Sequence, residues 1–336
     1  MPHTVTLISQ QESFTATGGE SILAAAKQQG LNLPHSCQSG ICGQCKARLL
    51  KGKTGVWQPH FEMALSEQEE QNGYILLCCS TAESDLEVEM PGYGGADALP
   101  VKTVPSRVAN IEYLADTAIV SLDLPKTASF AFHAGQYIDI LLKGGATRSY
   151  SLASHPNHPE RLELHIRHHP GGLFSQMLFS DHPQIIEKSI LRIRGPLGKA
   201  APLDANLPLI ILATGTGFAP VQSLLLQFID KHPSQRIHLY WGGRHLEDLY
   251  RFAEVEEWIS RLPHASFTPV LSRPDDNWRG ARGYVQTHAA ADYPDMTQIC
   301  VYACGSAAMI ESAYDLFSTH HQLAAEHFFS DVFTPA

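Results

Sequence analysis

The sequence CQSGICGQC is the stretch of the chain with the clearest capacity for chemistry. It places three cysteines within nine positions, namely Cys37, Cys42 and Cys45. Two more cysteines follow side by side at Cys78 and Cys79, so four thiolate ligands are available. The spacing C-x4-C-x2-C with a distant fourth cysteine is the plant-type arrangement for a [2Fe–2S] cluster. The spacing therefore predicts an iron–sulfur site, with either of the adjacent cysteines as its last ligand.

Two other kinds of sulfur chemistry fit this stretch less well. A zinc knuckle usually presents two C-x-x-C or C-x-x-H pairs, and the chain has no second pair. A thioredoxin-like C-x-x-C should follow a strand and open a helix, whereas this one lies in a glycine-containing loop. Gly40 and Gly43 suit a cluster, because backbone N–H groups must approach its sulfur atoms closely.

Composition sets the broad class of the protein. The chain has 336 residues, of which 44% are hydrophobic and 17% charged, as in a globular protein of two or three domains. Its net charge of −10 disfavours a general affinity for nucleic acid or anionic membrane. Through Gly92 there are 10 Asp and Glu against 5 Lys and Arg. This excess of acid predicts either a solvated acidic face or a docking surface for a redox partner.

Localisation is suggested by what the chain lacks and by its cysteines. The N-terminal sequence MPHTVTLISQ has no basic region followed by an apolar one, and no apolar run has the length of a membrane-spanning helix. Seven cysteines, odd in number and clustered, favour metal or redox use in a reducing compartment. We therefore expect a cytoplasmic protein without membrane insertion.

The elements that must position these residues fall into three segments. Residues 1–92 predict a small mixed sheet with one main helix, GESILAAAKQQG, ending at Gly30. The Gly- and Pro-rich sequence PGYGGADALP marks a boundary, with a linker at residues 93–102. Residues 103–203 contain short strands at the spacing of an antiparallel barrel, interrupted by one helix. Residues 204–336 alternate apolar strands with helices, which predicts a parallel sheet covered on both faces.

Taken with these segments, HSCQSGICGQCKARL resembles the cluster loop of plant-type ferredoxin domains fused to flavin reductases. The resemblance implies three domains: a β-grasp ferredoxin domain, an antiparallel β-barrel flavin domain and a doubly wound parallel α/β nicotinamide domain. In that family the fourth ligand lies in a segment like GYILLCC, so the resemblance implies Cys78 as the ligand. Cys79 is then expected to be a buried thiol that packs as a small hydrophobe.

The barrel segment resembles the flavin domain of the ferredoxin–NADP reductase superfamily. The resemblance is carried by GQYIDI, RSYS, HIRHHPGGLFS and GPLG, in that order. It implies that Arg148 binds the flavin pyrophosphate, that Tyr150 packs on the isoalloxazine ring and that Ser151 hydrogen-bonds near N5. A second phosphate site is implied at a helix N-terminus, by Gly171, Gly172 and Ser175. FAD is expected rather than FMN, because relatives with the cluster domain first usually bind FAD.

The third segment carries ATGTGFAP, a strand followed by a glycine turn and the start of a helix. By itself G-x-G is a weak signal, but G-T-G-x-A-P resembles the nicotinamide-nucleotide turn of the same superfamily. The implied cofactor-binding residues are Gly215, Thr216, Gly217 and Pro220. The sequence YACGS resembles the segment that holds the nicotinamide ring. The resemblance implies that Cys304 and Gly305 bind the cofactor and that Cys304 lies near the hydride path. A free core thiol at a strand end is the alternative for Cys304.

Two further residues bear on the nicotinamide site. The sequence WGGRHLEDLY lies where a 2′-phosphate would need basic groups; Arg244 permits that phosphate and Asp248 opposes it. The pattern looks like relatives that use NADH, so NADH is expected rather than NADPH. A C-terminal aromatic residue in this superfamily commonly lies against the flavin face that the nicotinamide must reach. Phe333 is the candidate, unless it only completes an edge strand.

The order of the three domains implies an electron-transfer enzyme. NADH gives two electrons as hydride and a [2Fe–2S] cluster accepts one at a time, so a flavin belongs between them. The sequence contains ILLCCSTAESDLEVEM, GTGFAPV, VYACGSAAMI and FFSDVF. Together these segments look most like the branch of CDP-6-deoxy-delta-3,4-glucoseen reductases, whose cluster supplies a pyridoxamine-dependent sugar dehydrase. Reductase components of ring-hydroxylating dioxygenases and other multicomponent oxygenases share this plan, and an oxygenase component is the alternative acceptor. A redox sensor or binding protein without turnover is the alternative of another class.

Overall fold

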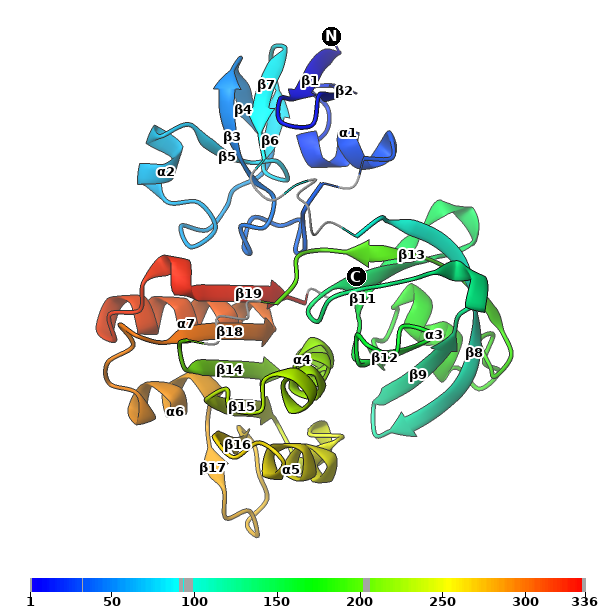
Figure 1. Ribbon diagram of the computed structural model, residues 1–336, viewed down its shortest axis with the longest axis vertical. Helices are drawn as coiled ribbons and strands as arrows, with labels where there is room; N and C mark the ends of the chain where they lie inside the picture. The colour runs from blue at the N-terminus through cyan, green and yellow to red at the C-terminus, as the bar shows by residue number, and fades with distance from the viewer. Residues whose placement is uncertain (1, 32, 91–92, 94–98, 202–205, 334–336) are drawn as a thin grey trace. The chain divides into compact units, whose positions relative to one another are not determined.

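The computed structural model describes residues 2–31, 33–90, 93, 99–201 and 206–333 (Figure 1). The chain forms two compact units. The first comprises Met1–Pro100 with Leu197–Lys199, and the second comprises Val101–Pro196 with Ala200–Ala336. Residues 94–98 of the predicted linker lie outside the described residues, and the predicted domain boundaries stay predictions.

The first unit is built on a five-stranded mixed sheet in the order β2-β1-β7-β3-β5. β1 and β2 form an antiparallel hairpin, and β1 pairs with β7 in parallel. Its strands are β1 (His3–Leu7), β2 (Glu12–Ala16), β3 (Lys46–Lys51), β4 (Thr54–Val56), β5 (Tyr74–Leu76), β6 (Ser80–Ala82) and β7 (Leu86–Glu89). Its helices are α1 (Ile22–Gln28) and α2 (Glu67–Gln71).

The two ends of the helix α1 are set by the side chain of Ser21 and by the backbone conformation of Gly30. The Ser21 side chain accepts a hydrogen bond from the Ala24 N–H and so caps the first turn. Gly30 has a φ of 85°, in the region that glycine adopts without strain, directly after the helix. Ile22 and Leu23 are buried in the same core as Val5 and Val88 of the sheet. This core holds the loop that carries the cysteines.

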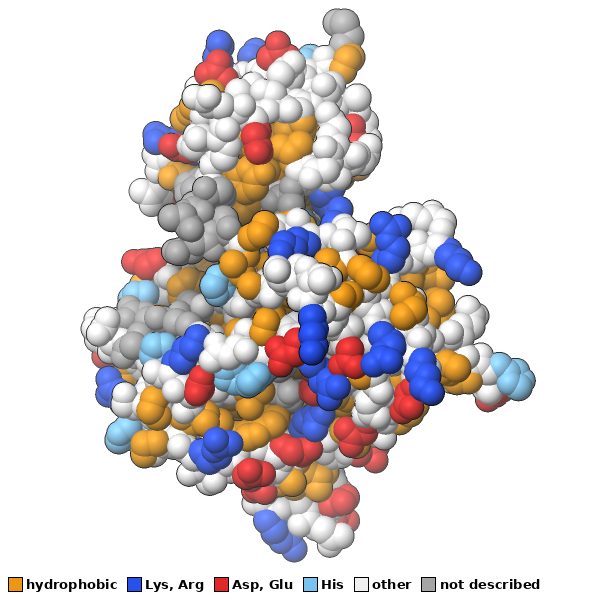
Figure 2. Space-filling model, turned by 45° about the vertical axis from the view of Figure 1, so that its right-hand side comes forward, with side chains coloured by type: hydrophobic (Ala, Val, Ile, Leu, Met, Phe, Trp, Pro, Cys, Tyr) orange, Lys and Arg blue, Asp and Glu red, His pale blue; other side chains and the backbone are white. Residues whose placement is uncertain are grey.

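A six-stranded antiparallel sheet opens the second unit, in the order β11-β10-β13-β8-β9-β12. A bridge between Leu152 and Leu164 joins the end of β11 to β12, so the first and last strands of the sheet meet and the sheet closes as a barrel. Its strands are β8 (Lys102–Leu114), β9 (Thr117–Asp123), β10 (Tyr137–Leu141), β11 (Thr147–Ser151), β12 (Arg161–Arg167) and β13 (Ile190–Leu197). The helix α3 (Leu173–Phe179) covers one opening. Figure 2 shows Lys and Arg side chains over the barrel.

The rest of the second unit is a six-stranded parallel sheet in the order β17-β16-β15-β14-β18-β19, with helices on both faces (Figure 1). Its strands are β14 (Leu209–Thr214), β15 (Ile237–Gly243), β16 (Ala265–Leu271), β17 (Ala281–Arg282), β18 (Cys300–Gly305) and β19 (Phe328–Val332). Its helices are α4 (Phe218–Lys231), α5 (Phe252–Ser260), α6 (Val285–Asp292) and α7 (Ala307–His320). The short 3₁₀ helices of the unit are η1 (Lys126–Ala128), η2 (Lys143–Gly145), η3 (Gly215–Gly217), η4 (Leu246–Asp248) and η5 (Ala325–His327).

The predicted fold class is confirmed in each of its three parts. The structure contains two elements that the sequence pattern did not indicate, α6 and β17. α6 has the sequence VQTHAAAD, whose small and polar residues give no clear apolar stripe. It forms because Val285 and Ala289 pack into the core beside β14 and β15. No helix in the described ranges combines the length and apolar character that crossing a membrane requires.

Candidate functional site

The loop that follows Cys37 is wrapped around its sulfur. The Cys37 Sγ accepts hydrogen bonds from the backbone N–H groups of Ser39, Ile41 and Cys42, at 3.4, 3.4 and 3.3 Å. Gly40 and Gly43 have φ values of 78° and 67°, which glycine adopts without a steric cost. Such N–H donors stabilise a thiolate, and a thiolate is the form of cysteine that binds metal.

The four cysteines predicted as ligands form two pairs. Cys42 hydrogen-bonds to Cys37, and this bond, with the backbone donors, lowers the pKa of the Cys37 thiol to about 5. Cys45 hydrogen-bonds to Cys78, and this bond lowers the pKa of the Cys78 thiol to about 3. Within the described ranges no three Cys, His, Asp or Glu side chains surround one common metal position. Two pairs of thiols fit a centre of two iron ions, each with two protein ligands.

Cys79 lies beside the second pair but has a different environment. Its sulfur is 3.5 Å from the Cys78 Sγ and lies 3.7 Å from the Pro59 carbonyl oxygen, to which its thiol donates. The Gln58 Nε2 donates to the Cys78 carbonyl oxygen at 3.1 Å and contacts the Cys79 Sγ at 3.9 Å. A Cβ on Gly40 would lie 2.8 Å from this sulfur, so the loop passes directly over Cys79. The structure thus supplies Cys79 with a protein partner of its own.

The residues of RSYS lie on β11 with alternating exposure. Arg148 and Tyr150 point to one face and Ser151 to the other, because successive side chains of a strand alternate. The Tyr150 ring lies 5.6 Å from the Phe174 ring, and burial raises its pKa. Arg148 is half-buried, with its Nη1 donating to the Thr147 carbonyl oxygen at 2.8 Å. One strand therefore offers a cation, an aromatic ring and a buried hydroxyl, the three groups to which the resemblance gives roles in flavin binding.

The turn before α3 holds the other predicted flavin residues. Ser175 is buried, and its Oγ accepts from the His169 N–H at 3.2 Å and donates to the His169 carbonyl oxygen at 3.1 Å. A Cβ on Gly172 would lie 2.6 Å from this oxygen, so a larger residue there would displace the Ser175 hydroxyl. Gly171 has a φ of 81° and faces open space. Serine thus holds a compact turn with free space beside it.

The predicted nicotinamide residues meet where the parallel sheet reverses its strand order, between β14 and β18. Ligands of such sheets bind at the carboxyl ends of the strands at this point. Gly215 and Gly217 follow β14 directly, Thr216 lies between them and Pro220 is in the first turn of α4. A Cβ on Gly217 would overlap the Cys304 carbonyl group, so the turn is packed against the end of β18.

The end of β18 connects the two halves of the second unit. Cys304 is fully buried opposite Asp331 of β19, and burial together with the Asp331 charge raises the pKa of its thiol. The Ser151 Oγ donates to the Asp331 Oδ2 at 3.4 Å. The Phe333 N–H donates to the Gly305 carbonyl oxygen at 2.8 Å. The serine predicted for the flavin and the cysteine predicted for the nicotinamide thus share one acidic neighbour.

Arg244 lies apart from this group, after β15, and is held by an acid. The Asp248 carboxylate accepts from the Arg244 Nη2 at 3.2 Å and from the Arg244 backbone N–H at 2.7 Å. The Arg167 Nη2 also donates to Asp248 at 3.2 Å. Burial opposes ionisation, but these donors hold the pKa of Asp248 below its usual value. Arg167 also lies against the glycine turn, since a Cβ on Gly215 would be 3.3 Å from its Nη1.

A buried polar network joins the barrel to α4 and to the residues directly before α5. The His165 ring bonds to the Glu163 carboxylate at 3.0 Å and to the Tyr250 hydroxyl at 2.8 Å. Gln222 of α4 donates to Glu163 at 2.6 Å, and the Arg251 guanidinium lies 3.5 Å from it. Burial opposes the charge on Glu163, but His165, Arg251 and Gln222 lower its pKa to about 2. Burial lowers the pKa of His165.

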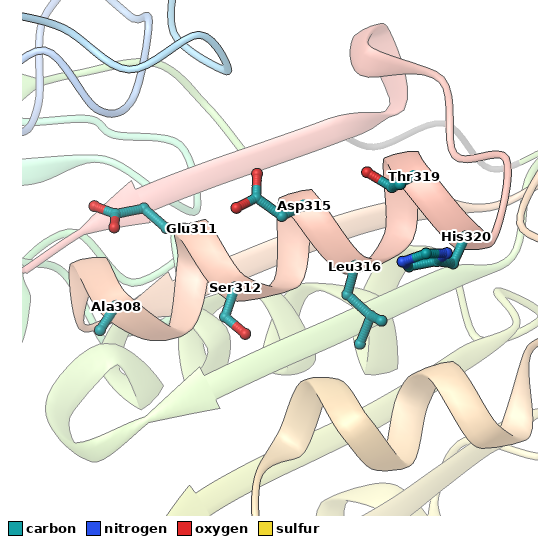
Figure 3. A pocket seen from close by; sticks show the side chains of 7 residues that line it. All are labelled: Ala308, Glu311, Ser312, Asp315, Leu316, Thr319 and His320. Carbon is teal, nitrogen blue, oxygen red and sulfur yellow. The ribbon is translucent and has the colours of Figure 1, made fainter.

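A surface hollow on α7 lies outside both groups of residues (Figure 3). Its lining comes from that helix alone: Ala308, Glu311, Ser312, Asp315, Leu316, Thr319 and His320. Because a single helix cannot enclose a ligand, this hollow is not a binding site.

Sequence reasoning missed three residues of these sites: Glu163, Arg167 and Asp331. Nothing in the sequence pattern of HIRHHP indicates that Arg167 reaches the glycine turn or that His165 is buried in the network. Asp331 had a detectable signal, because a charged residue inside the apolar strand FFSDV is expensive to bury without a partner.

Comparisons with known proteins agree with this arrangement. Residues 5–83 match the family described as "2Fe-2S iron-sulfur cluster binding domain". Residues 107–201 match the "Oxidoreductase FAD-binding domain" and residues 211–315 the "Oxidoreductase NAD-binding domain".

The similarity to curated reductases spans all three matched regions of the chain. The chain is 39% identical to CDP-6-deoxy-L-threo-D-glycero-4-hexulose-3-dehydrase reductase of Yersinia pestis, over 96% of both chains. It is 32% identical to terephthalate 1,2-dioxygenase, reductase component 2, of Comamonas sp, over 99% of this chain and 98% of that protein. Among solved structures, Amycolatopsis cytochrome P450 reductase GcoB is similar with a TM-score of 0.77 and 29% identity, over 99% of both chains.

Proposed function

The chain belongs to the reductases that join a [2Fe–2S] domain to FAD-binding and NAD-binding domains, and we propose that it takes electrons from NADH and supplies them to a sugar dehydrase. As a member of this family it is an NAD(P)H-dependent oxidoreductase that transfers electrons to a protein partner. It is therefore an enzyme, and the alternative prediction of a redox sensor without turnover is wrong. The observation that carries the electron path is the shared contact of Ser151 and Cys304 with Asp331.

We assign the cluster to four thiolates: Cys37, Cys42, Cys45 and Cys78. Their pairing and the backbone N–H donors around Cys37 support this set. Cys79 is left out because its thiol donates to the Pro59 carbonyl group. When bound, FAD exchanges electrons in pairs with NADH and singly with the cluster. The thiolates hold the cluster, and their N–H donors spread its negative charge.

The barrel residues bind and orient the flavin in this proposal. Arg148 neutralises the pyrophosphate, Tyr150 packs on the isoalloxazine ring and Ser151 hydrogen-bonds near N5. The turn of Gly171, Gly172 and Ser175 leaves space for a second phosphate. Support comes from the alternation along β11, which separates the ring and the guanidinium from the buried hydroxyl.

In the parallel sheet, we assign the nicotinamide nucleotide to the turn that follows β14. This turn consists of Gly215, Thr216 and Gly217, with Pro220 behind it. Cys304 and Gly305 would border the nicotinamide ring, and Phe333 would cover the flavin face that this ring must reach. A Cys304 thiol with a raised pKa stays protonated and uncharged, which suits a site that hydride must enter.

NADH is the proposed coenzyme because Arg244 already has a counter-ion. The Arg244 guanidinium is paired with the Asp248 carboxylate, which also accepts hydrogen bonds from two backbone N–H groups. A 2′-phosphate of NADPH would have to displace this carboxylate to reach the guanidinium. The negative charges of the 2′-phosphate and the Asp248 carboxylate would repel each other, which disfavours NADPH.

The proposed acceptor is a pyridoxamine-dependent dehydrase of the kind named in the 39% identical relative, a CDP-6-deoxy-L-threo-D-glycero-4-hexulose-3-dehydrase. An oxygenase component is the second candidate, supported by the 32% identity to a dioxygenase reductase. We place the enzyme in the cytoplasm, since none of the seven cysteines forms a disulfide and a reducing compartment keeps thiols and cluster ligands reduced.

Anaerobic stopped-flow spectroscopy tests the electron path. NADH should bleach the flavin absorbance first and the cluster absorbance afterwards, and NADPH should do so more slowly. Oxidation of NADH is then measured with either acceptor: the dehydrase with its CDP-hexulose in the absence of O₂, or a terephthalate oxygenase component with terephthalate and O₂. Turnover with the dehydrase alone supports the proposal, and turnover with the oxygenase alone would reverse the choice of acceptor.

A further inference from the structure

Three large apolar side chains stand on the surface of the first unit within six residues. Val56, Trp57 and Phe61 are 85%, 47% and 44% exposed. Single exposed apolar residues are common, but a group of them on a soluble protein marks an interaction surface. We call these three residues the exit patch.

The exit patch lies over the two segments that carry the cluster thiols. The Trp57 N–H donates to the Cys79 carbonyl oxygen at 2.8 Å, one residue after Cys78. The Phe61 N–H donates to the Gly40 carbonyl oxygen at 2.9 Å, inside the loop between Cys37 and Cys42. Electron transfer between proteins weakens steeply with distance, so a surface one hydrogen bond from the ligand segments is a favourable place for an acceptor.

The surroundings of the exit patch are acidic. Residues 54–90 contain eight Asp and Glu and no Lys or Arg. Glu62 directly follows Phe61 and is exposed, as is Glu67 at the start of α2. The His60 Nε2 lies 3.0 Å from the Glu70 Oε1, so the acidic helix α2 is next to the patch. An apolar centre with an acidic border complements a partner whose border is basic.

We propose that the exit patch docks the electron-accepting protein, through a face of that protein with an apolar centre and a border of Lys and Arg. The inference rests on the proposed function, because it names the surface through which that function delivers its electrons. Trp57 is the expected anchor, since exposed tryptophans dominate the energy of such interfaces. The acidic border sets the rate of encounter and makes binding sensitive to salt.

Binding without turnover gives the first test. The oxidised holoenzyme is titrated with cytochrome c, a small basic haem protein, and Kd is measured by surface plasmon resonance at low salt. Trp57→Ala and Phe61→Ala should each raise Kd about tenfold. The double variant Glu62→Gln/Glu67→Gln should raise Kd at low salt and flatten its salt dependence.

The chain offers a matched control. Leu50 is 47% exposed, as Trp57 is, but lies on β3 five residues beyond Cys45, roughly 16 Å at the rise of a strand. Leu50→Ala should leave Kd unchanged. Each variant is first checked for the absorbance of cluster and flavin, and Trp57→Phe, which keeps an aromatic ring, replaces Trp57→Ala if that protein loses its cluster.

Two results would overturn the proposal. One is an unchanged Kd in both the Trp57 and Phe61 variants, or an equal change in Leu50→Ala. The other is slower reduction of the cluster by NADH in the patch variants with Kd unchanged, which would mean that the patch serves the chain's own flavin domain. Neither result touches the proposed function, whose own failure would be a wild-type flavin that NADH does not reduce.

Discussion

The Ser151 hydroxyl donates a hydrogen bond to the Asp331 carboxylate at 3.4 Å, although the two residues are 180 positions apart in the chain. Ser151 ends β11 of the barrel, and Asp331 lies on β19, the last strand of the parallel sheet. Both side chains are buried, so the bond is shielded from water and its orientation is well defined. It makes Asp331 a positioning residue for the hydroxyl that we assign to the flavin.

Removal of this hydroxyl should slow reduction of the flavin by NADH. We expect Ser151→Ala to lower the rate about 10²-fold, the usual effect of losing one positioned hydrogen-bonding group in an active site. Asp331→Asn should lower it less, because the amide oxygen still accepts the bond. The rates are measured by anaerobic stopped flow on protein with its full FAD content.

Ser149→Ala is the matched control for this experiment. Ser149 lies on the same strand and also donates to a carboxylate, that of Asp139, at 2.7 Å. Its loss should leave the rate of flavin reduction unchanged. An equal effect in Ser149→Ala and Ser151→Ala would show that only the strand, and not the buried hydroxyl, matters.

Exchange of the adjacent cysteines should separate a ligand from its neighbour. We expect Cys78→Ser to abolish the visible absorbance and the EPR signal of the cluster, with FAD still reducible by NADH. Cys79→Ser should keep the cluster, because the hydroxyl can still donate to the Pro59 carbonyl oxygen. A cluster that survives in Cys78→Ser and is lost in Cys79→Ser would reverse the ligand assignment.

The parts of the site that lie close in sequence were predictable, and those joined across the fold were not. The cysteine spacing and the ATGTGFAP turn are local patterns, and each lies in the structure on the loop or strand end expected of it. Asp331, in contrast, meets Ser151 only because the end of β19 lies against the end of β11. No periodicity in either segment encodes that contact.

The roles of Arg167 and His165 also could not be predicted from the sequence, but for a different reason. Both lie in HIRHHP, where alternating polar residues look like a strand with no buried face. His165 is buried, with the Tyr250 hydroxyl as one polar partner and Glu163 as the other, and Gln222 of α4 donates to Glu163. A polar residue in a strand can therefore face either water or a second domain, and only the fold decides between them.

Coenzyme choice should respond to the counter-ion of Arg244. We expect Asp248→Asn to raise kcat/KM for NADPH about tenfold, because the guanidinium then becomes available to a 2′-phosphate. The variant should be less stable by roughly 1–3 kcal/mol, since Asp248 accepts several buried hydrogen bonds. Steady-state rates with both coenzymes check the change.

The double variant Asp248→Asn/Arg244→Ala separates the two contributions. It should lose the gain with NADPH, because the cation that binds the phosphate is gone, while NADH is used as before. If NADPH use rises equally in the double variant, Arg244 is not the group that meets the phosphate. If it does not rise in the single variant, coenzyme choice lies elsewhere.

Stability should fall in mild acid because of His165. Burial lowers its pKa in the folded state, so below about pH 6.5 the unfolded chain binds a proton that the folded chain does not. The free energy of unfolding therefore decreases as the pH falls from about 6.5, by up to about 1.4 kcal/mol per pH unit for this one group. Glu163, whose pKa is about 2, adds a further loss only below about pH 4.3.

Urea unfolding between pH 7 and pH 5, followed by the fluorescence of released FAD, measures this dependence. His165→Gln, which keeps a donor for Glu163, should be less stable at pH 7 but should show a shallower decrease towards pH 5. His264→Gln serves as the control, because His264 is exposed and lies outside the network of Glu163 and Tyr250. Parallel slopes for wild type and His165→Gln would mean that His165 takes up its proton in the folded protein as readily as in the unfolded chain, and that the network with Glu163 and Tyr250 does not hold it neutral.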